Sequence, residues 1–230
     1  MKRFYALSCW LLVLVAVGCC TKGPTTPAPQ SAERYTNAYK WEKEISAFEA
    51  SDKTNPPPKG AILFVGSSSI RFWKTLAQDF PDKQVINRGF GGSEIADSIW
   101  FADRIIIPYQ PRQIVFYAGN NDIALGKTPE RVIADFKRFL KLMHTQLPNT
   151  RISYISIHPN MSRWKLKEQV QTVNHAIAAI KDKKLAFIDV WPAMIGADGK
   201  PRPELYMPDN LHLNANGYAL WTSIVKPYLE

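Results

Sequence analysis

The feature that most constrains the fold is a regular alternation of buried-strand and helical patterns. Five short runs are almost continuously apolar, which is typical of strands covered on both faces of a sheet. They lie at residues 61–65, 84–87, 113–118, 151–157 and 185–190. Between these runs apolar residues recur at helical spacing, most clearly over residues 166–180. The alternation predicts an α/β protein, a three-layer α/β/α sandwich built on a five-stranded parallel sheet.

Helix-start signals support this interpretation. Residues 32 to about 52 have apolar side chains at helical spacing and are followed by Asn-Pro-Pro-Pro. Thr128 and Pro129 have the residue types favoured at the N-cap and at the first helical position. A last helix is predicted after Asn214.

The first residues have the pattern of a targeting segment. Lys2 and Arg3 precede an apolar run over residues 5–17, which is too short to span a bilayer as a stable helix. The run ends in Ala-Val-Gly-Cys, which resembles the lipobox of bacterial lipoproteins. The resemblance implies a signal peptide at residues 1–18 and a lipidated Cys19. The alternative is an ordinary secretory signal with an incidental cysteine.

Residues 19–31 are rich in proline and threonine, so we expect an extended tether rather than a packed element. A domain at residues 32–230 would then be held by its lipid anchor on a membrane of a bacterial cell envelope, facing the periplasm or the exterior. All 3 cysteines precede residue 32. The domain is therefore predicted to have neither a disulfide nor a thiolate metal site.

Composition excludes several classes of protein. Hydrophobic residues make up 46% of the 230 residues and charged residues 21%, as in an ordinary globular protein. The net charge of +9 is spread along the chain. With no zinc-finger spacing and no RNA-binding motif, the charge does not indicate a nucleic-acid partner. The oligomeric state does not follow from the sequence.

Polar groups suited to acyl transfer follow the predicted strands. The segments are Gly-Ser-Ser-Ser-Ile at 66–70, Gly-Phe-Gly-Gly-Ser at 89–93, Gly-Asn-Asn-Asp at 119–122 and Asp-Asn-Leu-His at 209–212. In a parallel sheet, loops after the strand carboxyl ends share one edge, where ligands bind. Acyl transfer needs a nucleophile, a base, a group that orients the base, and N–H donors for the oxyanion. All four kinds of group are present.

Taken alone, the pair Asp209 and His212 fits a surface ion pair better than a catalytic dyad. A serine-rich loop between strand and helix is also compatible with phosphate binding, but no Walker lysine and no GxGxxG motif accompanies it. One paired histidine and scattered carboxylates do not make a metal ligand set. We therefore expect neither a metal nor another cofactor.

The four segments in this order resemble the SGNH (GDSL-like) hydrolase family, most closely the branch that includes platelet-activating-factor acetylhydrolase-like esterases. The resemblance implies a flavodoxin-like strand order and a serine ester hydrolase that acts through an acyl-enzyme. It assigns Ser68 as the nucleophile, His212 as the general base and Asp209 as its orienting partner. The oxyanion hole would consist of the N–H groups of Ser68 and Gly92 and the side-chain amide of Asn121.

The usual Gly-Asp-Ser of the family has Ser67 in place of aspartate. Ser67 and Ser69 are thus adjacent alternatives to Ser68 as the nucleophile, although the register of the motif favours Ser68. A rival interpretation is a lipoprotein that keeps this fold but only binds envelope glycan. Another is a flavodoxin-like protein that binds a nucleotide or flavin.

The substrate does not follow from these motifs. Arg88 and Phe90 flank the oxyanion turn, and His158 ends the fourth strand, so these three are candidates for substrate contact. The family acts on acyl lipids, acetylated sugars and thioesters. An anchor on the envelope favours an ester of an envelope glycan or lipid as the substrate.

Overall fold

The computed structural model describes Met1 and residues 38–230. The predicted signal peptide at 1–18, the lipidation site Cys19 and the tether at 19–31 lie outside the described residues. The predicted N-terminal helix is described from Ala38 onward. It consists of a 3₁₀ turn, Ala38–Trp41, followed by α1, Glu42–Thr54.

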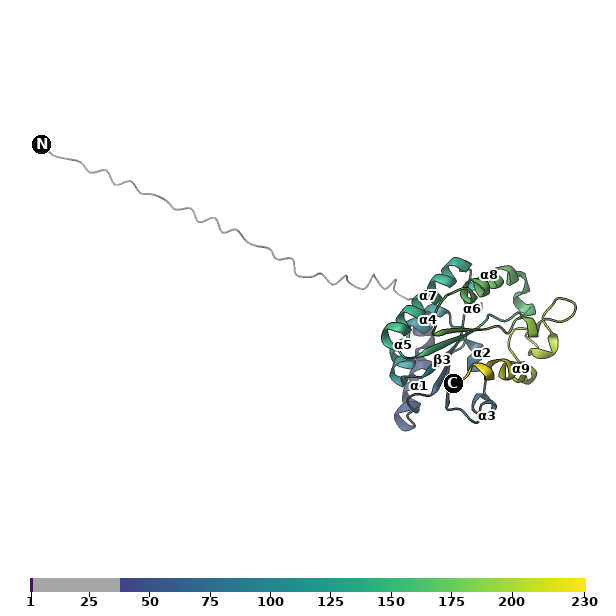
Figure 1. Cartoon of the computed structure of the whole chain (residues 1–230), viewed down its shortest axis with the longest axis horizontal. Helices are drawn as coiled ribbons and strands as arrows, with labels where there is room; N and C mark the ends of the chain where they lie inside the picture. Colours follow the sequence, from purple (N-terminus) through teal and green to yellow (C-terminus); the bar gives the residue numbers. More distant parts are fainter. Residues whose placement is uncertain (2–37) are drawn as a thin grey trace. The chain divides into compact units, whose positions relative to one another are not determined.

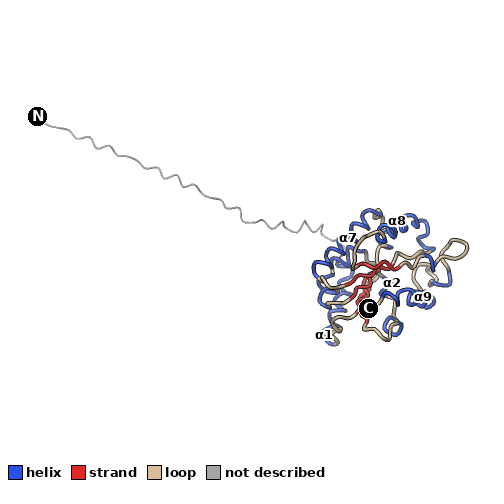
Figure 2. Tube along the Cα trace, in the orientation of Figure 1, coloured by secondary structure: helices blue, strands red, loops and turns tan. Residues whose placement is uncertain are grey.

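Five parallel strands form a single sheet with the order β2-β1-β3-β4-β5, shown in red in Figure 2. The bounds are Ile62–Gly66 for β1, Val85–Gly89 for β2, Gln113–Tyr117 for β3, Arg151–Ile155 for β4 and Leu185–Ile188 for β5. Each strand overlaps one of the five apolar runs. The predicted parallel sheet and its flavodoxin-like order are confirmed.

Helices cover both faces of the sheet (Figure 1). One layer is a continuous series of contacting helices: α1, α5 (Ala102–Ile105), α4 (Ile95–Trp100), α7 (Pro129–Gln146) and α8 (Lys167–Ala178). The opposite layer contains α2 (Ser68–Arg71), α3 (Leu76–Asp79) and α9 (Ala215–Val225). Short α6, Asn120–Ala124, contacts α7 and α8. Within residues 38–230 no helix is long and apolar enough to cross a membrane.

The predicted helix starts have the expected capping contacts. The Thr128 hydroxyl accepts the N–H of Arg131 at 3.4 Å, and α7 begins at Pro129. The side chain of Asn214 accepts the N–H of Gly217 at 3.1 Å, and α9 begins at the next residue. Each cap satisfies an N–H that has no partner inside the helix.

Alternating side chains join the sheet to the two layers. On β3, Phe116 stacks on Phe139 of α7 with ring centroids 4.2 Å apart. The next residue, Tyr117, contacts Trp221 of α9 at 5.1 Å. Successive strand residues point to opposite faces, so one buried strand supplies both cores.

The strand order also locates a crevice. From β1 the chain goes to β2 on one side and returns to β3 on the other side of β1. The segments that leave β1 and β3 therefore diverge at the carboxyl edge, where doubly wound sheets bind ligands. Ser68 and Asn121 lie on these two segments.

Candidate active site

Ser68 is the first residue of α2, two positions after β1 ends at Gly66. Gly66 has φ +134°, and a Cβ there would lie 1.9 Å from the carbonyl oxygen of Tyr117. That oxygen accepts the N–H of Ser67 at 2.9 Å. Only glycine allows the backbone of β1 to approach β3 so closely, and this approach fixes where α2 begins.

His212 lies between Ser68 and Asp209. Its Nε2 is 3.0 Å from the Ser68 Oγ, and its Nδ1 is 2.6 Å from the Asp209 Oδ2. The other carboxylate oxygen of Asp209 accepts the backbone N–H groups of Leu211 and His212 at 3.0 and 2.9 Å. An edge contact with Phe72 holds the imidazole from the side, with ring centroids 5.0 Å apart. The structure thus joins the three residues in one hydrogen-bonded relay.

The carboxylate of Asp209 is held in its charged form. Desolvation by partial burial raises its pKa, but the hydrogen bonds from the His212 side chain and from two backbone N–H groups outweigh that effect and lower the pKa to about 2. Asp209 is therefore ionised at neutral pH. An ionised partner at Nδ1 fixes the proton there and leaves Nε2 as the acceptor facing Ser68.

The three adjacent serines have different environments. Ser67 and Ser69 are buried, and the carbonyl of Ser69 accepts the hydroxyl of Tyr218 at 2.9 Å. The hydroxyl at hydrogen-bond distance from His212 is that of Ser68. This geometry favours Ser68 over both neighbours as a nucleophile.

Two of the expected oxyanion donors belong to short helices. Ser68 is at the first position of α2, where a backbone N–H has no acceptor within the helix. Asn121, in α6, donates one side-chain N–H to the carbonyl of Ser93 at 2.9 Å. Its side-chain oxygen accepts Nη1 of Arg163 at 3.0 Å. The second N–H of the Asn121 amide is not used by either contact.

The third expected donor, Gly92, lies in the turn after β2. Gly92 has φ +76°, a conformation that favours glycine. The turn begins where the N–H of Phe90 donates to the carbonyl of Gly66 at 2.9 Å, and Trp41 Nε1 donates to the carbonyl of Gly91 at 2.8 Å. Because the next residue, Ser93, accepts from Asn121, the turn is tied to both of the other donor segments.

Two of the residues expected to contact the substrate do not line the cavity that contains Ser68 and His212. Phe90 is fully buried and packs edge-on against Trp41 and Phe101. Arg88 forms an ion pair with Asp52 and donates to the Tyr109 hydroxyl at 2.7 Å. Both side chains are thus engaged with residues outside that cavity.

His158, the third residue expected to contact the substrate, lines the cavity that contains Ser68 and His212. The cavity is small and is bounded by Ser67, Ser68, Ser69, Tyr117, Asn120, Asn121, His158, Arg163, Leu211 and His212. Burial lowers the pKa of His158 to about 4, so its imidazole is neutral at neutral pH. Its Nδ1 contacts the carbonyl of Pro159 at 2.8 Å, and its Nε2 has no hydrogen-bond partner within the described residues.

A largely buried cluster of charged side chains lies next to the two segments that carry Gly92 and Asn121. Lys127 Nζ lies 2.7 Å from Glu94, 2.9 Å from Asp122 and 3.0 Å from Asp135. Burial raises the pKa of Asp122 to about 6, although the charge of Lys127 opposes the shift. The cluster connects α4, α6 and α7 immediately next to Ser93 and Asn121.

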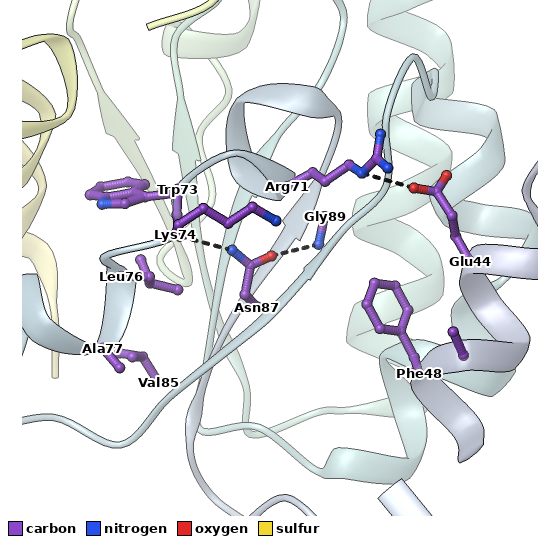
Figure 3. A pocket seen from close by; sticks show the side chains of 11 residues that line it. Glu44, Phe48, Arg71, Trp73, Lys74, Leu76, Ala77, Val85, Asn87 and Gly89 are labelled. Carbon is purple, nitrogen blue, oxygen red and sulfur yellow. Dashed lines mark hydrogen bonds and ion pairs between the residues drawn. The ribbon is translucent and has the colours of Figure 1, made fainter. Parts of the chain in front are cut away.

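A wider groove is lined by residues of α1, of β2 and of the segment that follows α2 (Figure 3). Two of its polar side chains are already engaged: Arg71 pairs with Glu44 at 2.9 Å, and the Asn87 side chain donates to the carbonyl of Ile70 and accepts the N–H of Gly89. Asn87 thereby links β2 to α2, the helix that begins at Ser68. None of Ser68, Asp209 and His212 lines this groove.

The sequence places Arg163 near the site but assigns it no role there, and it gives no indication of Lys127 or Trp41. Arg163 follows β4, whose carboxyl end lies on the catalytic edge, and this position was the one available signal. Lys127 and Trp41 act through contacts that depend on tertiary packing. Within residues 38–230 no group of three or more His, Cys, Asp or Glu side chains is arranged to hold a metal ion.

Comparison with protein families identifies residues 63–220 as a match to the GDSL-like Lipase/Acylhydrolase family. A curated relative is the platelet-activating factor acetylhydrolase IB subunit alpha2 of Gallus gallus. It is 26% identical over 220 residues, which cover 90% of this chain and 91% of the relative.

Solved structures share the fold. A protein from Streptococcus pneumonia described as a platelet activating factor has a TM-score of 0.74 and 21% identity, over 84% of this chain and 94% of its own. A GDSL-like lipase from Bacteroides thetaiotaomicron has a TM-score of 0.66 and 20% identity, over 84% and 96% of the two chains.

Proposed function

The chain belongs to the GDSL-like lipase/acylhydrolase family and is a carboxylic ester hydrolase, and we propose that it acts through an acyl-enzyme formed on Ser68. The observation that supports this mechanism most directly is the relay from Asp209 through His212 to Ser68, with contacts of 2.6 and 3.0 Å. A weak nucleophile needs an adjacent, oriented base, and the relay supplies one.

In the first half-reaction the Ser68 Oγ attacks the ester carbonyl while His212 Nε2 takes the hydroxyl proton. The carbonyl oxygen gains a negative charge, and the N–H groups of Ser68, Gly92 and Asn121 stabilise it. When the tetrahedral intermediate collapses, the bond to the alcohol breaks and His212 returns the proton to the leaving oxygen. The acyl group remains on Ser68.

In the second half-reaction water replaces the alcohol. His212 Nε2 takes a proton from the water, whose oxygen attacks the acyl-enzyme carbonyl. Collapse of this intermediate releases the carboxylic acid and returns the proton to Ser68. Asp209 stabilises the imidazolium in both halves and holds the ring in one tautomer.

The acyl group of the substrate is short, with acetyl preferred. Two observations support this choice: the small size of the cavity around Ser68 and His212, and similarity to a relative named as an acetylhydrolase. The carrier of the acyl group is an ester-bearing glycan or lipid of the cell envelope. That part rests on the sequence of the first 31 residues, from which we propose lipidation at Cys19 and an envelope location.

The test of the mechanism is Ser68→Ala, with Ser67→Ala and Ser69→Ala as matched neighbours. We expect hydrolysis of p-nitrophenyl acetate by Ser68→Ala to fall by roughly 10³-fold or more, and the two neighbours to remain active. A fluorophosphonate should label the wild type and not Ser68→Ala. Undiminished turnover by Ser68→Ala would refute the assignment, and failure to label the wild type would favour a protein that only binds glycan.

The acyl preference has its own measurement. Acetyl, butyryl and octanoyl p-nitrophenyl esters should give kcat/KM values that decrease with chain length. Acetylated oligosaccharides and lysolipids, compared at equal concentration, test the carrier. A preference for octanoyl would contradict the short-acyl proposal while leaving the acyl-enzyme mechanism intact.

A further inference from the structure

The side-chain amide of Asn121 donates through its nitrogen and contacts a cation, Arg163, through its oxygen. Arg163 Nη1 donates to the Asn121 side-chain oxygen at 3.0 Å, and both residues line the cavity that contains Ser68 and His212. We propose that Arg163 is a positioning residue of the oxyanion hole: it fixes the Asn121 amide and strengthens it as a donor. The inference rests on the proposed acyl-enzyme mechanism.

The two partners of the Asn121 amide determine its orientation. A guanidinium can only donate, so the atom of Asn121 that faces Arg163 must be the oxygen. The carbonyl of Ser93 can only accept, so the atom that faces it must be the nitrogen. A rotated amide would place two donors together and two acceptors together. The second N–H is therefore held in a fixed direction.

The charge of Arg163 is placed where it can polarise this amide. Arg163 is half-buried, and desolvation lowers the pKa of its guanidinium. An arginine side chain stays protonated in proteins, so the charge is retained. Among the residues that the structure describes, no carboxylate pairs with it. A cation bound at the amide oxygen draws electron density from the N–H groups, and hydrogen bonds linked in this way reinforce one another.

The backbone around Arg163 connects the donor to the catalytic base. The N–H of Arg163 donates to the buried side chain of Asn160 at 2.9 Å. One residue earlier, the N–H of Ser162 donates to the carbonyl of Asn210 at 3.2 Å, in the loop between Asp209 and His212. The 3₁₀ segment Met161–Leu166 is thus fixed to the triad loop on one side and holds Asn121 on the other.

These contacts give Arg163 a role that differs from substrate binding. As the carbonyl oxygen of the ester becomes negative, a correctly directed and polarised N–H gains more in the transition state than in the ground state. An interaction of that kind affects kcat rather than KM. A residue that only bound substrate would affect KM and leave kcat unchanged.

The test is a double-mutant cycle between Arg163→Met and Asn121→Ala, with kcat and KM measured on p-nitrophenyl acetate. Removal of one oxyanion donor typically costs about 10²–10³-fold, so we expect Arg163→Met to lower kcat by about 10–10²-fold with KM changed less than about threefold. In the Asn121→Ala background, Arg163→Met should have little further effect, because the amide through which it acts is gone.

Two further variants complete the experiment. Arg163→Lys retains the charge and a donor and should recover most of kcat, whereas Arg163→Gln retains only a neutral donor and should recover less. Lys165→Met removes an exposed cation from the same segment and should match the wild type. If Arg163→Met does not fold, Arg163→Gln takes its place in the cycle.

The inference is overturned if the two substitutions lower kcat independently, if Arg163→Lys is no faster than Arg163→Met, or if the loss appears in KM. Fluorophosphonate labelling separates this failure from that of the mechanism. Labelling of Ser68 in the wild type with an additive cycle refutes the role of Arg163 alone. Absence of labelling in the wild type refutes the acyl-enzyme itself.

Discussion

The carboxylate of Asp122 accepts the backbone N–H of Ile95, with its two oxygens 3.3 and 3.2 Å from the nitrogen. Asp122 follows Asn121 in α6, and Ile95 begins α4 after the Gly92 turn. One buried carboxylate therefore joins the two segments that carry the proposed oxyanion donors. Its charge is balanced by Lys127, which also forms ion pairs with Glu94 and Asp135.

Replacing Lys127 by methionine should make stability strongly dependent on pH. The raised pKa of Asp122, about 6, means that the folded protein binds this proton more tightly than the unfolded chain does. Its contribution to the unfolding free energy therefore falls as pH rises from about 4 to about 6. Without Lys127 the folded pKa rises further, so the loss of stability grows above pH 6.

At pH 8 we expect Lys127→Met to lose about 3–5 kcal/mol of unfolding free energy, because a buried carboxylate is left unpaired. At pH 5, where Asp122 is protonated with or without Lys127, the loss should be smaller. Urea denaturation at both pH values measures the difference, with Lys141→Met on the exposed face of α7 as the control. An equal loss at the two pH values would show that Asp122 does not titrate as described.

Asp209→Asn should lower kcat while leaving the fold intact. The carboxylate accepts from His212 Nδ1 and from two backbone N–H groups, and an amide reproduces only part of this pattern. Since the wrong tautomer of the imidazole can then be favoured, we expect a decrease of about 10²–10⁴-fold in kcat. Steady-state kinetics with p-nitrophenyl acetate measure the decrease. Asp198→Asn, in an exposed turn, is the control, and equal activity of both variants would argue against the relay.

Gly66→Ala should destabilise the protein more than Gly126→Ala. Both glycines have positive φ, +134° and +95°, so each substitution adds roughly 1–3 kcal/mol of backbone strain. At Gly66 the new Cβ would also meet the Tyr117 carbonyl at 1.9 Å, whereas nothing lies within 4 Å at Gly126. Thermal unfolding of the two variants isolates the cost of the close approach. Equal shifts in Tm would mean that β1 and β3 can separate locally without penalty.

Trp41→Phe should reduce turnover although Trp41 is distant in sequence from every proposed catalytic residue. The substitution removes the N–H that holds the carbonyl of Gly91 and keeps most of the contact with Phe90. A looser turn positions the Gly92 N–H less well. We therefore expect kcat to fall by about 3–10-fold, which is less than the decrease caused by complete loss of an oxyanion donor. Tyr39→Phe, an exposed neighbour, should have the activity of the wild type. If Trp41→Phe also has the activity of the wild type, the turn keeps its position without the Trp41 hydrogen bond.

The sheet could be predicted from sequence because a central parallel strand is apolar throughout. Residues 62–65 are fully buried, and their pattern identifies β1 without further information. The short helices α2, α4 and α6 were not predicted, because four to six residues are too few for a helical period to appear. They begin at turns whose positions depend on contacts between neighbouring strands.

The proximity of Ser68 and His212 was also predictable, since the carboxyl ends of parallel strands share an edge. The contact of Arg163 with Asn121 was not, because it depends on the path of a 3₁₀ segment whose backbone leaves helical geometry at Arg163 itself, with φ −121° and ψ 23°. Arg88 and Phe90 show the opposite case. Both are near the oxyanion turn in sequence, yet both pack against residues outside the Ser68 cavity.

The separation of Ser68 and His212 by 144 positions has a practical consequence. A chain divided in an exposed connection between β2 and β3 would leave the hydroxyl on one fragment and the imidazole on the other. Neither half alone would turn over an ester, whereas two halves that reassociate would. Ester turnover in such a split protein would report, in real time, the docking of β1 onto β3.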